Sequence, residues 1–566
     1  MYNIAFDILR LGLIFIGIFV FALHVRYYLH MLQLSSYQLP GYLKRLGEST
    51  SKINIQMFYY VLFAVLFPLI SGRLNILGIC FFNPLPVWHL ISPAASFIII
   101  AASIYSISIF SPKNEKKKFV ATDRIKRLMI TLFLLLFAFT AVLSLFGRNF
   151  SGKIPFFVFL TVMFALPYMT ALANKINLPI EKNINDGFIR DAQRILKEHR
   201  YLKILGVTGS FGKTSVKYYV TSILSESFDV LMTPESYNTP MGIVRTIREK
   251  LKPSHEIFVC EMGARHVGDI KEITDIVHPD DGIVTAIGEQ HLETFFSLEN
   301  IINTKYELFD EISSNSKGLM FANGDNENIR ANMRYDNVIT YGLNAENDFR
   351  AKNLEVASSG TTFKIEVSQK LMERLFSDKN IADEKKRELE NTSFKTSLVG
   401  AHNVQNISGA MAIAFVYGMS AVKIARGVKR IAAVPHRLEL KKHGNVTILD
   451  DAYNSNPAGA KVALETLSLF KDRIKILVTP GMVELGDREK ELNKSFGKQA
   501  ADVCDYIILV GEKRTAPIAE GISESGFSKD RLFVRDSFNL AAKLMYEIEP
   551  ENEKVILLEN DLPDNY

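Results

Sequence analysis

The stretch TGSFGKT, residues 208–214, has the residue types that bind the phosphates of a nucleotide. Glycines allow backbone N–H groups to turn toward phosphate oxygens, and the first turn of a helix adds a favourable partial positive charge. In such a loop the lysine, here Lys213, contacts the terminal phosphates, and the hydroxyl of Thr214 binds Mg²⁺. The strict form of the loop has a glycine where Val207 stands. The stretch predicts a phosphate-binding loop with altered spacing; the alternative is an ordinary turn between a strand and a helix.

Three residues farther along the chain could complete a metal-dependent site. Glu261 ends the apolar run EIFVCE, His291 follows the run GIVTAIG, and Lys305 lies in the next helical segment. A carboxylate at a strand end is well placed to bind Mg²⁺, because this hard ion prefers oxygen ligands. Taken singly, the acid could be a solvated strand end, and the other two residues could be structural or solvent-facing. Their order behind a phosphate loop predicts one shared site.

The elements that must position these residues follow an α/β pattern. Beyond residue 175, short apolar strands alternate with amphipathic helices, and several strands run straight into glycine, among them KILGVTG and EIFVCEMG. This pattern is typical of a largely parallel sheet whose strand ends face a ligand-binding crevice. We predict a central domain at 176–432 and a C-terminal domain at 433–566, joined near VPHRLEL (Val434–Leu440).

The first third of the chain has a different character. It contains five apolar runs: Leu11–Val25, Met57–Ile70, Ile91–Phe110, Leu128–Phe146 and Ile154–Ala173. The last three are near the roughly 20 residues that a helix needs to cross hydrocarbon. The first run lacks a basic segment before it and a small-residue cleavage site after it, which favours a retained anchor over a signal peptide. We predict a multi-spanning membrane domain of about five helices at 1–175; the alternative is a set of helices buried in a large soluble core.

Two details refine this membrane prediction. The apolar segment Leu74–Ile91 is interrupted by Asn83, Pro84 and Pro86, which indicates a re-entrant or interfacial piece with Trp88 at the headgroups. The loop Ser111–Arg127 carries seven Lys/Arg and two acids, and short basic loops tend to stay in the cytoplasm. Five spans then place the N-terminus outside and everything after about residue 175 inside, at the cytoplasmic membrane. The basic residues of the short outer turn, Arg148 and Lys153, argue mildly against this orientation.

The composition fits a chain that is part membrane and part soluble. Of its 566 residues 48% are hydrophobic, while 22% are charged, which is near the average for soluble proteins. The formal net charge of +5 is small for this length and gives no argument for a nucleic-acid partner. The three cysteines stand at scattered spacings, so neither a disulfide framework nor a zinc site is predicted. A reducing, cytoplasmic setting is expected for the soluble part.

Between about Ile204 and Gly486 the sequence resembles the Mur ligases, ATP-dependent enzymes that form amide bonds in peptidoglycan synthesis. Within that family it is most similar to the ligases that add D-alanyl-D-alanine to a UDP-N-acetylmuramoyl-tripeptide. The matching motifs are TGSFGKTS, YNTPMG, EMGARHVGDI, HLETFFSLENIINTKYELF, NGD, GAHNVQNISGAMA, HRLEL, DDAYNSNP and GMVELG. The resemblance implies a P-loop central domain followed by a Rossmann-like C-terminal domain, with ATP and two Mg²⁺ ions as cofactors.

The resemblance also implies a role for each matching residue. The implied ATP-binding residues are Thr208, Gly209, Ser210, Gly212, Lys213, Thr214, Ser215, Asn323, His402, Asn406, Arg437 and Asp451. The implied metal ligands are Thr214, Glu261, His291 and Lys305, and the implied catalytic residues are Lys213, Glu261, His291, Lys305 and Arg437. Lys305 occupies the position of a lysine that is carbamylated in many family members. Asn323 and Asn406 could equally be a turn residue and a polar contact of a helix.

The implied reaction activates a carboxylate as an acyl phosphate with ATP and joins it to the amine of an amino acid or dipeptide. Two departures from the family bear on the substrates. Membrane spans stand where relatives have a UDP-sugar domain, and the chain ends in the acidic VILLENDLPDNY, where relatives have a basic strand end. We therefore expect a carboxylate acceptor that is lipid-linked or polymeric. The alternatives are a capsule-type polyglutamate synthase and a transporter or envelope-assembly component driven by nucleotide.

Overall fold

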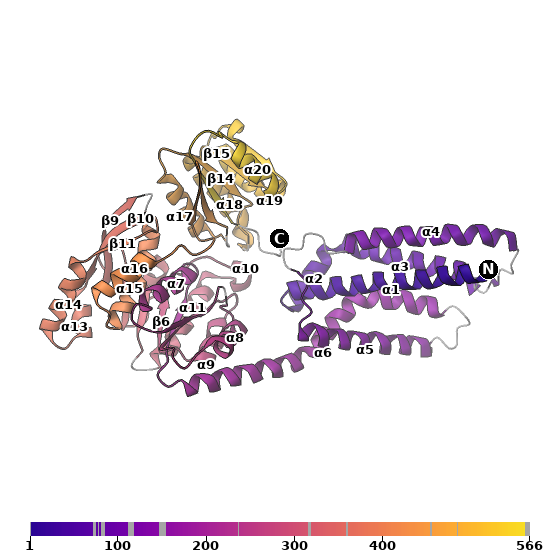
Figure 1. The fold of residues 1–566 in the computed structure, drawn as a ribbon, viewed down its shortest axis with the longest axis horizontal. Helices are drawn as coiled ribbons and strands as arrows, with labels where there is room; N and C mark the ends of the chain where they lie inside the picture. Colours follow the sequence, from indigo (N-terminus) through magenta and orange to yellow (C-terminus); the bar gives the residue numbers. More distant parts are fainter. Residues whose placement is uncertain are drawn as a thin grey trace. The chain divides into compact units, whose positions relative to one another are not determined.

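The computed structural model describes residues 2–71, 75–76, 79–80, 85–110, 118–146, 154–235, 237–314, 318–357, 360–452, 455–483 and 485–560. The chain forms two compact units, one of residues 1–186 and one of residues 187–563. The first unit is helical and is drawn in indigo and purple in Figure 1. The second unit contains two β-sheets with their helices.

Long helices make up the first unit. They are α1 (Tyr2–Leu34), α2 (Leu39–Glu48), α3 (Thr50–Ser71), α4 (Leu85–Phe110), α5 (Asp123–Phe146) and the first part of α6 (Ile154–Glu198). A short pair of strands, β1 (Asn75–Ile76) and β2 (Ile79–Cys80), lies between α3 and α4. Each of the five predicted apolar runs lies within one of the five longest of these helices.

Two helical stretches of the described residues are long and apolar enough to cross a membrane. They are Leu11–Leu34 in α1 and Asp123–Val142 in α5, and the apolar stretch Ala95–Phe110 of α4 is shorter. The described residues thus support two of the five predicted spans, and core helices of soluble proteins can pass the same test. Asn83 and Pro84 of the predicted re-entrant piece lie outside the described residues, as does the side chain of Trp88.

Polar contacts join the helices of this first unit. The buried imidazole of His24 on α1 lies 2.6 Å from the Tyr60 hydroxyl on α3 and 3.1 Å from the Ser106 hydroxyl on α4. Arg127 on α5 donates two hydrogen bonds to the Glu181 carboxylate on α6, at 2.7 and 2.8 Å. Because apolar side chains give little preference for one helix register over another inside hydrocarbon, such bonds between helices can fix the packing. The same helices expose many large apolar side chains, with Phe15 at 69% and Phe137 at 75% exposure.

The central domain is built on a nine-stranded sheet with the strand order β11-β10-β9-β8-β7-β6-β3-β5-β4. The strands are β3 (Lys203–Thr208), β4 (Val230–Met232), β5 (Ile257–Glu261), β6 (Asp281–Val284), β7 (Met320–Asn323), β8 (Val338–Gly342), β9 (Phe349–Ala357), β10 (Gly360–Val367) and β11 (Ser393–Thr396). From β4 to β9 the neighbours pair in parallel, whereas β9, β10 and β11 pair antiparallel.

Helices cover both faces of this sheet (Figure 1). They are α7 (Lys213–Leu224), α8 (Pro240–Lys250), α9 (Asp269–Val277), α10 (Leu292–Phe295), α11 (Leu298–Ser313), α12 (Glu327–Ala331), α13 (Gln369–Leu375), α14 (Lys379–Asn391), α15 (Ala401–Val416) and α16 (Ala421–Arg430). In β5 the side chains of Ile257 and Val259 enter one core with α7, α15 and α16, while Phe258 and Cys260 enter a second core with α8, α9 and α11. Since both faces are covered, all residues of β5, β6 and β7 are buried.

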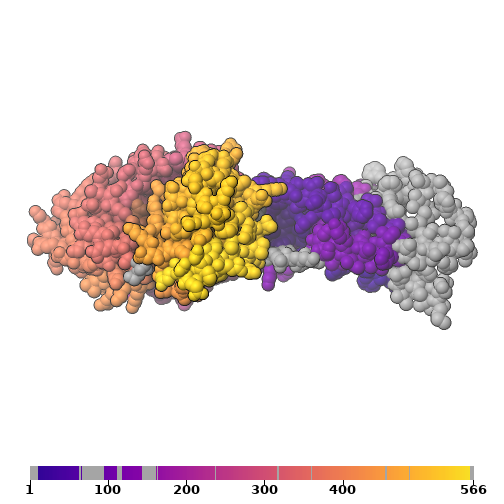
Figure 2. Space-filling view, turned by 90° about the horizontal axis from the view of Figure 1, so that it is seen from above, coloured from indigo at the N-terminus to yellow at the C-terminus, as the bar shows by residue number. Residues whose placement is uncertain are grey.

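The C-terminal domain has a six-stranded sheet with the order β12-β13-β17-β14-β15-β16. Its strands are β12 (Glu439–His443), β13 (Val446–Asp451), β14 (Ile474–Thr479), β15 (Tyr506–Val510), β16 (Leu532–Arg535) and β17 (Lys554–Glu559). Its α-helices are α17 (Pro457–Ser468), α18 (Glu489–Val503), α19 (Glu512–Glu524) and α20 (Phe538–Glu547). Only the β12–β13 pair is antiparallel. Figure 2 shows the surface of this domain in orange and yellow, and an ion pair from Arg488 to Glu289 joins it to the central domain.

Candidate nucleotide-binding and active site

The predicted phosphate loop joins β3 to α7, and its two glycines are required by geometry. Gly212 is the N-cap residue of α7 with a φ of +79°, and a Cβ there would lie 3.1 Å from Asn406 Oδ1. Gly209 has a φ of +151°, and a Cβ there would collide with the Thr285 hydroxyl and lie 3.0 Å from the backbone of Ala286. Glycine reaches such conformations without a steric penalty. The loop thus curls against β6 and α15 with no space for side chains at these two positions.

The loop is held in place by hydrogen bonds to the segment that follows β6. The backbone N–H of Ser210 donates to the Ala286 carbonyl at 2.6 Å. The Ser210 hydroxyl donates to the Gly288 carbonyl at 3.0 Å and accepts from the Gly288 N–H at 3.1 Å. The Thr208 hydroxyl donates to the Met262 carbonyl at 2.9 Å, which ties the end of β3 to the end of β5. These bonds fix the loop at the carboxyl edge of the parallel sheet, where ligands of α/β proteins bind.

The ammonium group of Lys213 folds back onto its own loop. Its Nζ donates to the carbonyl oxygens of Gly209 at 2.7 Å and Ser210 at 3.0 Å. Burial lowers the pKa of Lys213 to about 8, and the positive charge of Arg437 adds to this effect while Glu261 opposes it. A nearby anion favours the charged form of a lysine. The phosphates of a bound nucleotide would therefore raise this pKa and replace the carbonyl contacts.

Thr214 and Glu261 meet directly beneath this loop. The Thr214 hydroxyl donates to Glu261 Oε1 at 3.0 Å, and the amide of Asn238 donates to the same oxygen at 3.1 Å. The other oxygen, Oε2, lies 2.9 Å from Nζ of Lys217. Glu261 and Lys217 are fully buried, at 1% and 0% exposure.

These residues fit the coordination habits of Mg²⁺. The described residues contain no group of three His, Cys, Asp or Glu side chains that could hold a metal by themselves. Magnesium in nucleotide sites is usually bound by one or two protein oxygens together with phosphates and water. A hydroxyl and a carboxylate 3.0 Å apart, beside a phosphate loop, match that pattern.

Lys305 and His291, the other two predicted metal ligands, lie on α11 and at the start of α10. Lys305 on α11 is 2% exposed, and burial together with the charge of Lys213 lowers its pKa well below the usual range. His291 is the half-buried N-cap residue of α10, with a φ of +53°, and its carbonyl accepts the N–H groups of Thr294 and Phe295.

The three residues predicted on the adenosine side are distributed around the loop. Asn323 ends β7 and donates from its amide to the Thr285 carbonyl at 3.0 Å, on the strand that holds the loop. Asn406 on α15 lies against Gly212. His402 lies in the first turn of α15, where burial lowers its pKa to about 4, so the ring is neutral and can accept a hydrogen bond.

Two residues at the entrance of the C-terminal domain act on the loop electrostatically. Arg437 lies in the linker between α16 and β12, and its charge contributes to the lowered pKa of Lys213. Asp451 ends β13 and receives the Leu438 N–H at 3.2 Å. Burial raises the pKa of Asp451 to about 6, and Arg437 opposes the increase. The charge of Arg437 thus acts on both Lys213 and Asp451.

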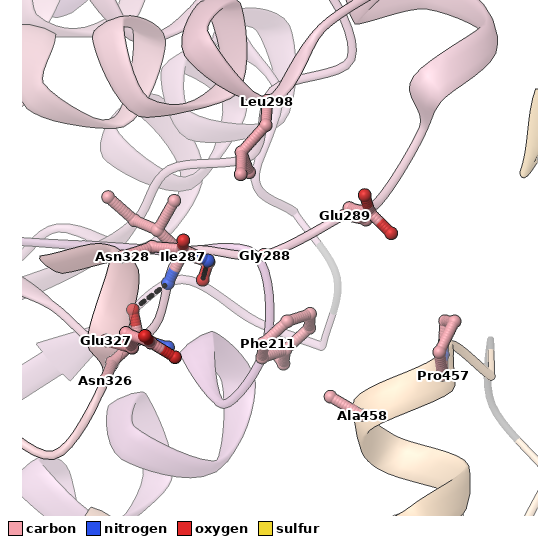
Figure 3. Close-up of a pocket in the computed structure, with 10 residues that line it drawn as sticks. All are labelled: Phe211, Ile287, Gly288, Glu289, Leu298, Asn326, Glu327, Asn328, Pro457 and Ala458. Carbon is pink, nitrogen blue, oxygen red and sulfur yellow. Dashed lines mark hydrogen bonds between the residues drawn. The ribbon is translucent and has the colours of Figure 1, made fainter.

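A cavity of about 400 Å³ lies beside the loop, between the central and C-terminal domains (Figure 3). Its described lining includes Phe211 of the loop, Gly288 and Glu289 after β6, and Pro457 and Ala458 at the start of α17. In Figure 3 the ring of Phe211 and the side chain of Ala458 point toward one another from the two domains. This cavity is not predictable from the sequence, because its walls come from segments far apart in the chain, from Phe211 to Ala458.

The sequence reasoning also missed Lys217 and Asn238. Both lay inside quoted motifs or next to them, in GKTSVK and YNTPMG, but their residue types alone gave no signal of a site. The signal that could have identified them is the order of the motifs, since both residues lie on segments that adjoin the edge of the sheet where Glu261 lies.

Comparisons with known proteins agree with this fold. Residues 207–414 match the Mur ligase middle domain, and residues 436–559 match the Mur ligase glutamate ligase domain. The UDP-N-acetylmuramoyl-tripeptide–D-alanyl-D-alanine ligase of Bacillus subtilis is 31% identical over 333 residues, which are 58% of this chain and 67% of the relative. The ligase of the same name from Escherichia coli is 30% identical over 338 residues, which are 59% of this chain and 70% of the relative.

Solved structures show the same fold. A crystal structure of MurF from Acinetobacter baumannii has a TM-score of 0.57 at 22% identity, covering 67% of this chain and 77% of that one. A MurF ligase from Thermotoga maritima in complex with ADP has a TM-score of 0.56 at 24% identity, covering 67% of this chain and 80% of that one.

The fold and the phosphate loop define an ATP-dependent ligase that forms carbon–nitrogen bonds. The chain belongs to the Mur ligase family, and it combines that family's middle and C-terminal domains. Residues before 207 lie outside both matched regions.

Proposed function

We propose that the protein is a membrane-anchored Mur ligase of peptidoglycan synthesis that joins a carboxylate acceptor to the amine of an amino acid or dipeptide. The observation that carries this proposal is the meeting of Thr214 and Glu261, 3.0 Å apart, under the loop of Lys213. The sequence relatives are named as ligases that use D-alanyl-D-alanine, which makes this dipeptide the first amine to test.

In the proposed reaction an acceptor carboxylate oxygen attacks the γ-phosphorus of ATP, ADP leaves, and an acyl phosphate forms. The amine nitrogen then attacks the acyl carbon, inorganic phosphate leaves, and the nitrogen loses a proton. A free carboxylate resists attack by an amine because it is a poor electrophile, and phosphorylation removes this barrier. Lys213 and Arg437 would stabilise the negative charge that crowds around the transferred phosphate.

Thr214 and Glu261 would hold one Mg²⁺ ion, whose positive charge screens the phosphates. We assign a second ion to His291 and Lys305, with Lys305 carbamylated. The support for this assignment is the burial of Lys305, which lowers its pKa and so favours the neutral amine. Only a neutral amine reacts with CO₂, and the product is an anion that can bind a metal.

We place the protein at the cytoplasmic membrane as a multi-pass protein, with its ligase domains in the cytoplasm. Support comes from the apolar stretches Leu11–Leu34 and Asp123–Val142 and from the large apolar side chains exposed on the first unit. Soluble proteins rarely expose contiguous apolar surface on this scale. Since this unit stands where relatives have a UDP-sugar domain, we propose an acceptor that is lipid-linked or polymeric.

The C-terminal strand supports a difference at the amine side of the reaction. Glu559 ends β17 and is fully buried, and burial together with Asp451 raises its pKa well above the usual range. Its neighbour Asn560 donates to the Gly481 carbonyl at 2.6 Å. Where relatives have a basic strand end, this chain thus has a carboxyl group, so the natural amine can differ from D-alanyl-D-alanine.

The decisive experiment measures phosphate release and product mass with the full chain in lipid nanodiscs. ATP, D-alanyl-D-alanine or other amines, and either a UDP-linked or a lipid-linked acceptor are supplied. ATP turnover should require both an acceptor and an amine, and the lipid-linked acceptor should be the one consumed. Turnover without either substrate would instead indicate a nucleotide-driven transporter, and repeated addition of one amino acid would indicate a polyglutamate synthase.

Two variants test the site within this assay. Lys213→Ala and Glu261→Ala should each lower turnover by at least about a hundredfold, the scale expected when charge stabilisation of the transition state is lost. The exposed Lys471 is a matched control, and Lys471→Ala should leave the rate unchanged. Normal rates in both site variants would refute the assignment.

A further inference from the structure

Lys217 is a buried lysine that the reaction described above does not use. It lies on α7, one helical turn after Lys213, and is 0% exposed. Its Nζ lies 2.9 Å from Glu261 Oε2 and also donates to the backbone carbonyl of Glu235. An unpaired charge is costly to bury, so charged groups at this depth are normally paired. Removal of either partner would leave an uncompensated buried charge. Lys217 and Glu261 are therefore one electrostatic unit.

The two oxygens of the Glu261 carboxylate are held in different ways. Oε1 accepts hydrogen bonds, whereas Oε2 makes an ion pair with Lys217 and accepts no hydrogen bond from the residues that the structure describes. Oε1 receives the Thr214 hydroxyl and the Asn238 amide, and Oε2 faces Lys217. The backbone N–H of Glu261 donates to the Thr233 hydroxyl at 3.1 Å, which also fixes the main chain. The oxygen that Thr214 contacts is the one placed for a shared metal ion, while the opposite oxygen is held by a positive charge.

The charges around the loop favour the binding of an anion over the binding of a free cation. Lys217 neutralises Glu261, and Asp451 opposes Arg437, so Lys213 leaves a positive charge at the loop. A free divalent cation would meet this charge, and the nearby Glu261 carboxylate is already paired with Lys217. A triphosphate would be attracted to the same group and would bring oxygen ligands for the metal.

We propose that Lys217 is a positioning residue that pairs with Glu261 and makes metal binding depend on the nucleotide, so that Mg²⁺ enters with ATP and does not bind first. This inference rests on the proposed role of Thr214 and Glu261 as metal ligands. In this arrangement Lys217 stays paired with Oε2 of Glu261, while the metal ion would bind Oε1 and the Thr214 hydroxyl. Loss of the lysine frees the carboxylate to bind a metal without nucleotide, but in a less fixed position.

The test measures metal binding directly and does not need turnover. Mn²⁺, which shares the oxygen-rich sites of Mg²⁺, is titrated into the full chain in nanodiscs and followed by electron paramagnetic resonance, with and without ADP. The unaltered protein should bind Mn²⁺ at the site only when ADP is present. Lys217→Met should bind Mn²⁺ without ADP at least about tenfold more tightly than the unaltered protein, because a positive charge 2.9 Å from the carboxylate is gone. Lys217→Arg keeps the charge and should retain the dependence on ADP.

Lys554 offers a matched control in the C-terminal domain. It is 1% exposed and donates to the backbone carbonyls of Tyr546 and Ile548, so Lys554→Met removes an equally buried ammonium without touching Glu261. This variant should lose stability and keep the Mn²⁺ behaviour of the unaltered protein. If Lys217→Met does not fold, the double variant Lys217→Met/Glu261→Gln removes both charges and should fold but bind no Mn²⁺ at the site, with or without ADP.

Two results would overturn the inference. One is Mn²⁺ binding at the site of the unaltered protein that is equally tight with and without ADP. The other is a Lys217→Met protein, or the double variant in its place, whose Mn²⁺ binding matches that of the unaltered protein. A failure of the ligation assay with normal, ADP-dependent Mn²⁺ binding would count against the proposed reaction and leave the role of Lys217 standing.

Discussion

Two carboxyl groups share the carboxyl edge of the C-terminal sheet, and they give this domain its own response to pH. Asp451 and Glu559 end the neighbouring strands β13 and β17 and are paired in register. Parallel neighbours in register direct their side chains to the same face, and like charges at that spacing disfavour ionisation of both groups. Burial accordingly raises the pKa of Asp451 to about 6 and that of Glu559 well above the usual range.

The raised pKa of Asp451 predicts a pH-dependent effect of the variant Asp451→Asn. Since the folded pKa of about 6 exceeds the ordinary aspartate pKa of 3.8, the folded state binds this proton more tightly than the unfolded state. The resulting stabilisation is fully present below pH 3.8 and is lost as the pH rises through 6. A neutral amide avoids that loss, so the variant should melt a few degrees higher than the unaltered protein at pH 8, with the difference vanishing toward pH 4.

Calorimetry of the full chain across this pH range checks the effect. The exposed Asp472 provides the control, because Asp472→Asn should leave the melting temperature unchanged throughout. If the melting temperatures of Asp451→Asn and the unaltered protein differed by the same amount at every pH, the Asp451 carboxyl group would not be titrating between pH 4 and pH 8.

At the residue scale, the sequence predicted those parts of the site whose types signal chemistry. A lysine and a threonine after a glycine turn, and an acid at a strand end, predicted Lys213, Thr214 and Glu261, and the structure brings Thr214 and Glu261 within 3.0 Å of each other. The role of Lys217 was not predictable, because a lysine in a helix is usually solvated and nothing in its type shows that its face of α7 is buried. Its partner became visible only when β3 and β5 were placed side by side.

At the scale of elements, the phosphate loop depends on the left-handed conformation of Gly212 at the start of α7. This residue has a φ of +79°, and a Cβ would also press against Asn406. We predict that Gly212→Ala weakens ADP binding by at least about tenfold, because a side chain in this conformation costs roughly 1–2 kcal/mol before the contact with Asn406 is counted. Isothermal titration with ADP measures the change.

Gly268 is the matched control for this prediction. It is the N-cap residue of α9 with a φ of +89°, and a Cβ there would meet nothing within 4 Å. Gly268→Ala therefore carries a similar backbone penalty away from the loop and should bind ADP as the unaltered protein does. Equal ADP affinities for the two variants would show that the conformation of Gly212 is not needed for binding.

Helices and strands were predicted well where apolar residues form regular runs, and poorly where a helix continues through proline. The strands β3 and β6 follow directly from the apolar runs KILGVTG and GIVTAIG. In contrast, α6 continues to Glu198 through Pro167 and Pro179, although proline in a helix interior removes a hydrogen bond and disfavours continuation. The sequence analysis placed a domain boundary after residue 175 at the change in composition, and composition alone does not show that one helix extends across it.

At the scale of the whole molecule, the division into two compact units predicts that they can be separated. A fragment beginning at Gly187 contains both matched ligase domains and keeps the contact between Arg248 and Asp191, whose atoms lie 2.7 Å apart. We expect this fragment to fold, to remain in solution without detergent, and to bind ADP within about threefold of the affinity of the full chain. The full chain should sediment with membranes until detergent is added, because its first unit exposes large apolar side chains.

Centrifugation of cell fractions and titration with ADP test both halves of this expectation. A full chain that stays in solution without detergent would contradict the membrane anchor. A fragment that folds but no longer binds ADP would show that the first unit contributes to the nucleotide site.

The folded-back position of Lys213 has a consequence for selectivity among anions. Its ammonium already satisfies two carbonyl oxygens of its own loop, at 2.7 and 3.0 Å, so an incoming anion must compete with bonds that exist. A single orthophosphate or sulfate ion forms few contacts that could offset the loss of these bonds, whereas a nucleotide forms contacts along its whole length. We therefore expect small anions such as orthophosphate and sulfate to compete poorly with ATP at this loop.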